Sequence, residues 1–228
     1  MDRETTPEAA KARILQAALP HVAFDGWSAA TLAAAITDSG VAPGLAQALF
    51  PRGGIDLAVA YHRAGDAAMA EALAERDLSG LRFRDRVALA IRLRLELADK
   101  EAVRRGSTLF ALPQHAAEGA NLLWGTADAI WTALGDTSRD VNWYSKRASL
   151  SAVHAATVLY WLGDTSDDHT ATWEFLDRRI DNILQIEKLK AGLRMNPALR
   201  ALMSGPLRIL DRISAPQPAT DLPGKMKG

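Results

Sequence analysis

Histidine and carboxylate side chains could supply acid–base chemistry in this chain, and one pair of them has a suggestive spacing. His62 and Asp66 stand four residues apart, which brings two side chains together on one face of a helix. A general base can use such a carboxylate partner. A surface ion pair is the simpler interpretation, and the sequence favours it. The remaining histidines are scattered: His21, His115, His154 and His169.

The other residue patterns that carry common chemistry are missing. No Glu-x-x-His pair could build a di-iron site in a helical bundle. There is no cysteine, which excludes disulfides, thiolate metal sites and cysteine nucleophiles. Gly-x-Gly, Gly-x-Ser-x-Gly and phosphate-loop patterns are also absent. We therefore expect no catalytic residue, no metal site and no cofactor.

DNA recognition is another possible function, because residues 40–50 have the spacing of a DNA-contacting helix. Base contacts need forked donors and acceptors, and phosphate contacts need Lys or Arg. Gln47 alone suits the first task and nearby Arg52 the second. Residues 1–63 carry five basic against six acidic side chains, whereas a DNA-binding unit should be basic. A helix-turn-helix that packs without contacting DNA is the favoured interpretation.

The elements that position this segment are well marked. Gly26 can end a first helix, Ser28 can cap a second over residues 29–39, and Gly40 can make the turn. Pro43 suits the first position of a third helix. Residues 8–63 resemble the N-terminal three-helix unit of TetR-type regulators. The resemblance lies in the segments RILQAAL (13–19), DGWS (25–28) and Gly40-Val41.

Helical periodicity continues through the rest of the chain, and no strand-like alternation occurs. Helices are predicted at 55–76, 81–97, 102–112, 116–134, 141–162 and 170–193. Breaks are predicted at Gly80, Gly106, Pro113, Gly135-Asp136 and 163–166. The prediction is an all-α fold: a three-helix unit (8–63), a larger helical bundle (64–193), a terminal amphipathic helix (194–213) and a disordered tail (214–228).

Five of the six tryptophans fall between residues 124 and 173. Tryptophans at helical spacing, such as Trp124 and Trp131, usually belong to a core or a dimer interface. The small residues on the same helices also allow an apolar cavity. For a lipid in such a cavity, the candidate lining residues are Phe110, Leu123, Ala127, Val153 and Thr157.

The run DVNWYSKR (140–147) is rich in residues that anchor protein interfaces. Asp140 can cap a helix that begins at Val141, and Trp143 then lies one turn from Arg147. Two interpretations fit: a buried tryptophan behind a helix cap, or an exposed patch that binds a partner.

The sequence resembles the COQ9 family of ubiquinone-biosynthesis accessory proteins in four segments: this run, Leu112-Pro113, IWTALGD (130–136) and TWEFLDRRI (172–180). The resemblance covers most of residues 11–186 and suggests a bacterial member. It implies a TetR-like homodimer that has lost DNA binding, binds an isoprenoid quinone precursor or phospholipid, and assists the di-iron demethoxyubiquinone hydroxylase. The partner-binding residues that it implies are Asp128, Ile130, Asp140, Trp143 and Tyr144.

Residues 197–213 form an amphipathic pattern of their own. Its predicted membrane-facing residues are Leu199, Arg200, Leu202, Met203, Leu207, Arg208, Leu210 and Arg212. From residue 188 to 213 there are six basic residues and one acid in a chain of zero net charge, which suits an anionic membrane surface. The same helix could instead dock on the protein's own core with its basic side chains solvated. Gly205-Pro206 must kink it in either case.

The first eight residues lack the apolar run of a signal peptide or a transit peptide. We therefore expect a cytoplasmic protein that associates peripherally with the inner membrane. The predicted function is to take polyprenylated quinone precursors from the membrane and present them to the hydroxylase. The alternatives are a TetR-type transcriptional regulator with an apolar effector, and a dimeric scaffold without ligand.

Overall fold

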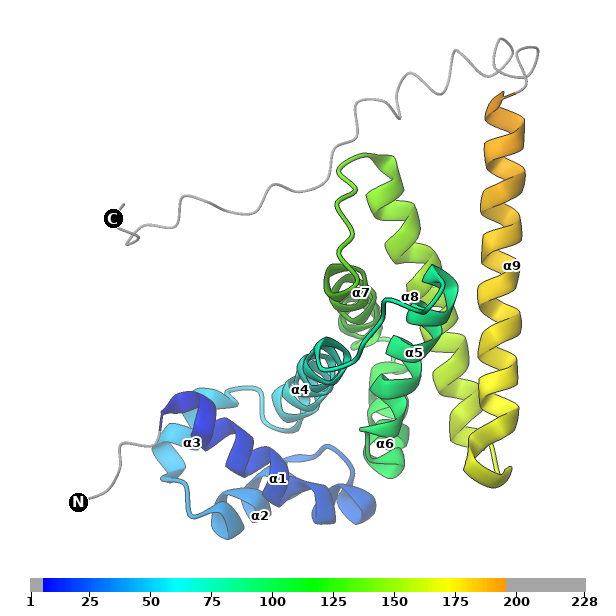
Figure 1. Cartoon of the computed structure of the whole chain (residues 1–228). Coiled ribbons are helices and arrows are strands. Elements are labelled where there is room, and N and C mark those ends of the chain that lie inside the picture. The colour runs from blue at the N-terminus through cyan, green and yellow to red at the C-terminus, as the bar shows by residue number, and fades with distance from the viewer. Residues whose placement is uncertain (1–5, 196–228) are drawn as a thin grey trace, which may run out of the picture.

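The computed structural model describes residues 6–195, and its regular elements in that range are all helical (Figure 1). They are α1 (Pro7–Asp25), α2 (Ala29–Ser39), α3 (Pro43–Leu49), α4 (Gly54–Ala74), α5 (Phe83–Glu96), α6 (Lys100–Phe110), α7 (Ala116–Ala133), α8 (Val141–Gly163), the short 3-10 helix η1 (Asp167–His169) and α9 (Thr170–Met195). The all-α prediction is confirmed over this range. From residue 196 onward, the predicted amphipathic helix and tail lie outside the described residues.

The helix ends predicted at Gly26, Ser28, Gly40 and Pro43 are confirmed. Gly26 and Gly40 follow α1 and α2 with φ of 64° and 62°, a conformation that glycine adopts without strain. The Ser28 hydroxyl accepts a hydrogen bond from the Thr31 N–H at 3.1 Å and so caps α2. Pro43 is the first residue of α3. Local side-chain chemistry therefore sets the ends of these helices.

The break predicted at Gly106 is wrong, because this residue lies inside α6. A Cβ atom at this position would lie 3.5 Å from Nε1 of Trp27, an ordinary contact distance, so α6 packs closely against that ring here. Tertiary packing outweighs the roughly 1 kcal/mol that glycine costs a helix interior.

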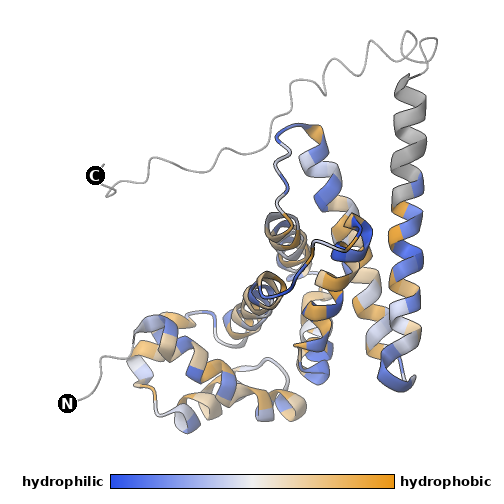
Figure 2. Cartoon of the chain, viewed as in Figure 1, coloured by the Kyte–Doolittle hydropathy of each residue, from blue (hydrophilic) through white to orange (hydrophobic). Residues whose placement is uncertain are grey.

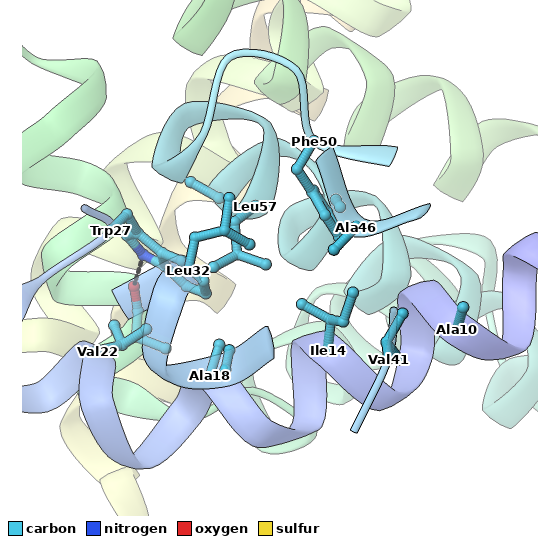
Figure 3. Close-up of a cluster of buried hydrophobic side chains, with 14 residues drawn as sticks. Ala10, Ile14, Ala18, Val22, Trp27, Leu32, Val41, Ala46, Phe50 and Leu57 are labelled. Atoms are coloured by element: carbon cyan, nitrogen blue, oxygen red, sulfur yellow. Dashed lines mark hydrogen bonds between the residues drawn. The ribbon is translucent and has the colours of Figure 1, made fainter. Parts of the chain in front are cut away.

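The first core joins α1–α4 to α6. Ile14, Trp27, Phe50 and Leu57 pack together in it (Figure 3). The indole N–H of Trp27 donates to the Ala102 carbonyl at 3.0 Å, a bond that connects this core with α6 (Figure 3). The three-helix unit is thus anchored to the rest of the protein and lies to one side of the bundle (Figure 1).

The second core fills the bundle of α4, α5, α7, α8 and α9. Helix α4 runs through the boundary predicted at residues 63 and 64, and gives Leu57 to the first core and Met69 to the second. Hydrophobic residues dominate α4 and α7 in the interior, whereas the described part of α9 carries many polar residues (Figure 2). Among the described helices, none is long and apolar enough to span a membrane.

Candidate functional site: an apolar cavity and an aromatic patch

A cavity of about 350 Å³ opens among α4–α8, with Trp27 of the three-helix unit in its wall. Its walls come from Trp27 in the α1–α2 connection and from α4, α5, α6, α7 and α8. This volume lies at the low end of the roughly 300–1,000 Å³ of small-molecule sites. The lining is mainly apolar, as a lipid-binding site requires.

The lipid-binding residues predicted from the sequence separate into two groups. Phe110 and Leu123 line the cavity. Ala127 and Val153 lie in the second core, and the buried Thr157 donates to the Val153 carbonyl at 2.8 Å. Trp27 lines the cavity although it belongs to the three-helix unit. No local pattern points to Trp27, because its position depends on how the two units pack.

A polar cluster is buried beside the cavity, and it consists of His62, Asp66, Arg94 and Thr126. Asp66 accepts hydrogen bonds from Arg94 Nε at 2.7 Å and from the Thr126 hydroxyl at 2.9 Å. Arg94 also donates to the His62 carbonyl at 3.0 Å. Gly65 leaves room for this guanidinium, since a Cβ there would lie 2.7 Å from Arg94 Cζ.

His62 and Asp66 lie close together, as their four-residue spacing predicted, but the pair is largely buried and not at the surface. Asp66 is buried, and its closest charged partner is Arg94, twenty-eight residues away in sequence. The His62 ring lies 3.8 Å from Asp66 and 2.8 Å from the Thr126 hydroxyl. Arg94, which is distant in sequence, is thus the main charged partner of the carboxylate that the local spacing assigned to His62.

We expect the protein to lose stability in mild acid because His62 is buried in its neutral form. Burial, and then the charge of Arg94, lower the pKa of His62 from 6.5 to about 4. The unfolded chain therefore binds a proton before the folded one does, so stability is full above pH 6.5 and falls toward pH 4. The contribution of His62 is about 2–3 kcal/mol. Urea unfolding at pH 7.5 and at pH 4.5 measures the change in the free energy of unfolding.

His62→Gln should reduce this pH dependence, and the buried His154, whose pKa is also lowered, should supply what remains. Equal slopes for wild type and His62→Gln would contradict the assignment.

The exposed face of α3 has little that could contact DNA. Its exposed residues, with Ala42 just before it, are Pro43, Gly44, Gln47 and Ala48. Basic residues nearby serve the fold: Arg13 donates to the Ser39 carbonyl, and Arg52 pairs with Asp56 at 2.6 Å and with Glu118 of α7 at 2.8 Å. These side chains stabilise the three-helix unit and its contact with the bundle.

A second candidate site is a surface cluster of half-buried aromatic rings, Trp124, Trp143 and Tyr144, which we call the aromatic patch. The centroids of Trp143 and Tyr144 are 4.8 Å apart with the rings edge to face. Trp124 of α7 lies 5.8 Å from Trp143 and 6.3 Å from Tyr144. Aromatic rings held in this way on a surface are typical anchors of protein interfaces.

The side chain of Arg147 packs against the aromatic patch. Its guanidinium stacks over Trp143 at 4.0 Å from the ring centroid, as the one-turn spacing predicted. It also pairs with Asp128 at 2.6 Å and with Asp136 at 3.2 Å. Lys146, at 2.7 Å, also contacts Asp136. These hydrogen bonds outweigh the burial of Asp136 and lower its pKa to about 2, so the carboxylate is charged at neutral pH.

The residues predicted to bind a partner have different surroundings. Asp128 is partly exposed beside Arg147, and Asp140 is exposed and caps α8 by accepting from the Asn142 N–H at 3.0 Å. Trp143 and Tyr144 lie in the patch. Ile130 has 0% of its surface exposed and belongs to the second core, so its side chain is not part of this surface. The sequence missed Trp124 as a patch member because α7 brings it there from nineteen residues away.

Within residues 6–195, no three histidine, cysteine or carboxylate side chains gather in a way that could hold a metal ion. The two candidate sites are thus an apolar cavity and a surface cluster of aromatic rings.

Comparison with known proteins gives a consistent result. A family model described as COQ9 matches residues 116–187. The ubiquinone biosynthesis protein COQ9, mitochondrial, of Drosophila melanogaster is 32% identical, covering 82% of this chain and 59% of the fly protein. The probable ubiquinone biosynthesis protein coq9, mitochondrial, of Dictyostelium discoideum is 30% identical, covering 84% and 67%. The human COQ9 protein is 29% identical over 76% of this chain and 57% of its own length. The chain thus spans less than two thirds of the fly and human proteins.

Among solved structures, the TetR transcriptional regulator from Nitrosomonas europaea ATCC 19718 is similar, with a TM-score of 0.60 and 18% identity. The match covers 75% of this chain and 95% of that chain. At this identity the likeness concerns the fold, and it confirms the predicted TetR-like architecture.

Proposed function

Because the chain belongs to the COQ9 family, we propose that it is a lipid-binding accessory protein of ubiquinone biosynthesis and not itself an enzyme. It takes a polyprenylated quinone precursor from the membrane and presents it to the di-iron demethoxyubiquinone hydroxylase. The observation that carries the proposal is the mainly apolar cavity among α4–α8. The aromatic patch, which shares no residue with the cavity lining, supports the second half of the proposal, because a carrier needs a docking site for its partner.

The first test is native mass spectrometry of the purified protein, followed by organic extraction and identification of the lipid. We expect a homodimer that carries an isoprenoid or phospholipid. An empty protein of any oligomeric state would favour the scaffold without ligand.

Ala120→Trp should abolish lipid co-purification. Ala120 of α7 is exposed and lines the cavity, so an indole there occupies the opening without entering the core. The matched control is Ala117→Trp, because Ala117 is also exposed on the same helix but does not line the cavity. Both variants should keep the wild-type melting temperature. Wild-type lipid content in Ala120→Trp would contradict the assignment of the cavity.

Replacing Trp143 and Tyr144 together by alanine should weaken hydroxylase binding at least about thirty-fold, since a hot-spot side chain contributes about 2 kcal/mol or more. Titration calorimetry with the purified hydroxylase measures this. Phe24→Ala is the control, because it removes an 84%-exposed ring of α1, outside the patch. Unchanged affinity in a folded double variant would show that the partner binds elsewhere.

Membrane contact is proposed for the segment containing Leu199, Arg200, Leu202, Met203, Leu207, Arg208, Leu210 and Arg212, with the protein at the cytoplasmic side of the inner membrane. Flotation with anionic vesicles tests it: deletion of residues 197–228 should abolish co-flotation, and retained co-flotation would contradict the proposal.

The alternative function is transcriptional regulation, which the TetR-like fold favours. The exposed face of α3 has few side chains that could contact bases or phosphates, which argues against transcriptional regulation. A gel shift with upstream DNA at moderate salt should show no specific complex, whereas tight binding would favour the regulator.

A further inference from the structure

The mouth of the cavity lies where α6 meets α7. Within the described part of the chain, the exposed residues of the cavity wall are Ala111, Ala116, Ala120 and Leu159. The first three belong to the corner between α6 and α7, and Leu159 faces it from α8. Phe110, the last residue of α6, is half-buried at this corner and also lines the cavity. A ligand that enters here passes the ring of Phe110.

Helix α6 is fixed to its neighbours mainly through its first half, residues 100–105. Hydrogen bonds connect this half to other elements: Trp27 donates to the Ala102 carbonyl at 3.0 Å, Lys100 to the Asp164 carbonyl at 2.9 Å, Arg104 to the Leu162 carbonyl at 2.9 Å and Arg105 to the Ala23 carbonyl at 2.6 Å.

The second half of α6, residues 107–110, is held differently. Its described side-chain hydrogen bond stays inside the helix, from the Thr108 hydroxyl to the Arg104 carbonyl at 3.0 Å. Leu109 and Phe110 contact the first core through apolar surface only partly buried. A segment with few buried contacts opens at a lower free-energy cost than the core does, so this half is the easier one to displace.

The two halves meet at Gly106-Ser107, inside the helix. Glycine weakens a helix interior, and Gly/Ser pairs are among the few places where helices kink sharply. A bend at this pair would move Phe110 and leave the hydrogen-bonded first half in place.

Gly119 lets the end of α6 close on α7. A Cβ atom at Gly119 would lie 2.8 Å from Cβ of Phe110 and 3.3 Å from its carbonyl oxygen, which is too close for any other residue without a shift of the backbone. The corner is therefore closed by direct packing of Phe110 against the backbone of α7.

We propose that the second half of α6 is a gate for the ligand. It bends at Gly106-Ser107, moves Phe110 away from Gly119 and so widens the mouth between α6, α7 and α8. This inference rests on the proposed lipid binding and adds to it the route by which the ligand enters and leaves. Such a gate sets the rates of uptake and release, whereas the affinity depends on the cavity behind it.

Because the chain has no cysteine, one engineered disulfide can lock the gate. Phe110→Cys with Gly119→Cys uses the 2.8 Å contact between Cβ positions, and a shift of about 1 Å brings these atoms to the roughly 3.5–4.5 Å of a disulfide. The probe is N-phenyl-1-naphthylamine, a neutral dye whose fluorescence rises in apolar surroundings. Stopped-flow fluorescence of the delipidated full-length protein should show uptake at least about ten-fold slower in the oxidised variant than in the same variant reduced.

Trapping is the second readout of the same variant. Dye loaded into the reduced protein should stay bound after oxidation, because release passes the same gate. The wild-type protein, treated with the same oxidant and reductant, should exchange the dye at one rate throughout, since it has no thiol to oxidise.

Gly106→Ala tests the hinge without a cross-link. Its Cβ would lie 3.5 Å from Nε1 of Trp27, an ordinary contact, so the alanine fits. Dye uptake should slow about five-fold, the rate equivalent of the difference in helix propensity between glycine and alanine. The matched control is Gly125→Ala in α7, where an added Cβ meets nothing within 4 Å and which does not line the cavity. Its uptake rate should equal that of the wild type.

The outcomes separate the gate from the lipid-binding proposal. If the wild-type protein binds no dye, the proposed lipid binding fails and the gate fails with it. If the wild type binds dye but the oxidised and reduced variants exchange it at equal rates, the gate is wrong and lipid binding stands. Immediate loss of the dye on oxidation would also overturn the gate, because the contact at Gly119 would then shape the binding site itself. Should the double variant not fold, equal rates in Gly106→Ala and Gly125→Ala decide against the gate.

Discussion

Asp66→Asn should lower the free energy of unfolding by about 3–5 kcal/mol, because it leaves the guanidinium of Arg94 buried without a counter-charge. The side chain of Arg94 is 4% exposed, and its Nε atom lies 2.7 Å from Asp66. Thr126 loses its carboxylate acceptor in the same change. Urea denaturation at pH 7.5, followed by circular dichroism, measures the effect.

Asp56→Asn is the matched control, since Asp56 lies on the same helix and also pairs with an arginine. Its partner Arg52 is 54% exposed, so water replaces the lost contact and the loss should be much smaller. Replacing Asp66 by leucine together with Arg94 by methionine should recover stability relative to Asp66→Asn, because no unpaired charge then stays buried. Similar losses in Asp66→Asn and Asp56→Asn would contradict the interpretation.

Arg147→Met should destabilise the protein by about 3 kcal/mol and also disrupt the aromatic patch. The buried guanidinium connects Asp128 of α7, Asp136 of the α7–α8 connection and the ring of Trp143. The expected loss lies at the low end for a broken buried pair, because Asp136 keeps Lys146 and Ser138 as partners. Thermal and urea unfolding measure the stability, and hydroxylase titration measures the patch.

Arg92→Met provides a control with the same kinds of contact in an exposed setting. Arg92 pairs with Glu96 at 2.6 Å and lies over Trp173 at 4.9 Å, but its side chain is 47% exposed. We expect little loss of stability and normal hydroxylase binding. If Arg147→Met behaved like Arg92→Met, the patch would be held by the aromatic contacts alone.

The Asp66–Arg94 pair and the group of charges around Arg147 both consist of side chains that the fold brings together from separate elements. Asp66 and Arg94 lie beside the cavity, and Arg147 lies beneath the patch. Their loss should therefore impair lipid retention and partner binding respectively, beyond the loss of stability. Lipid content of Asp66→Asn and hydroxylase affinity of Arg147→Met, measured on the folded fraction, check this separation.

The sequence by itself determined the features that depend on neighbours within about five residues. The ends of the helices at Gly26, Ser28 and Asp140 follow from local capping chemistry. The stacking of Arg147 on Trp143 follows from the helical repeat. Local periodicity also gave the all-α class, because amphipathic helices must bury one face whatever they pack against.

Only the tertiary structure decided which of the buried faces leave a cavity and which charges meet. Leu123 and Ala127 lie one turn apart on α7, yet Leu123 lines the cavity and Ala127 is in the core. Asp66 binds Arg94 in preference to its local neighbour His62. The physical reason is that helix rotation and docking bring together residues far apart in the chain, and no local spacing encodes those contacts.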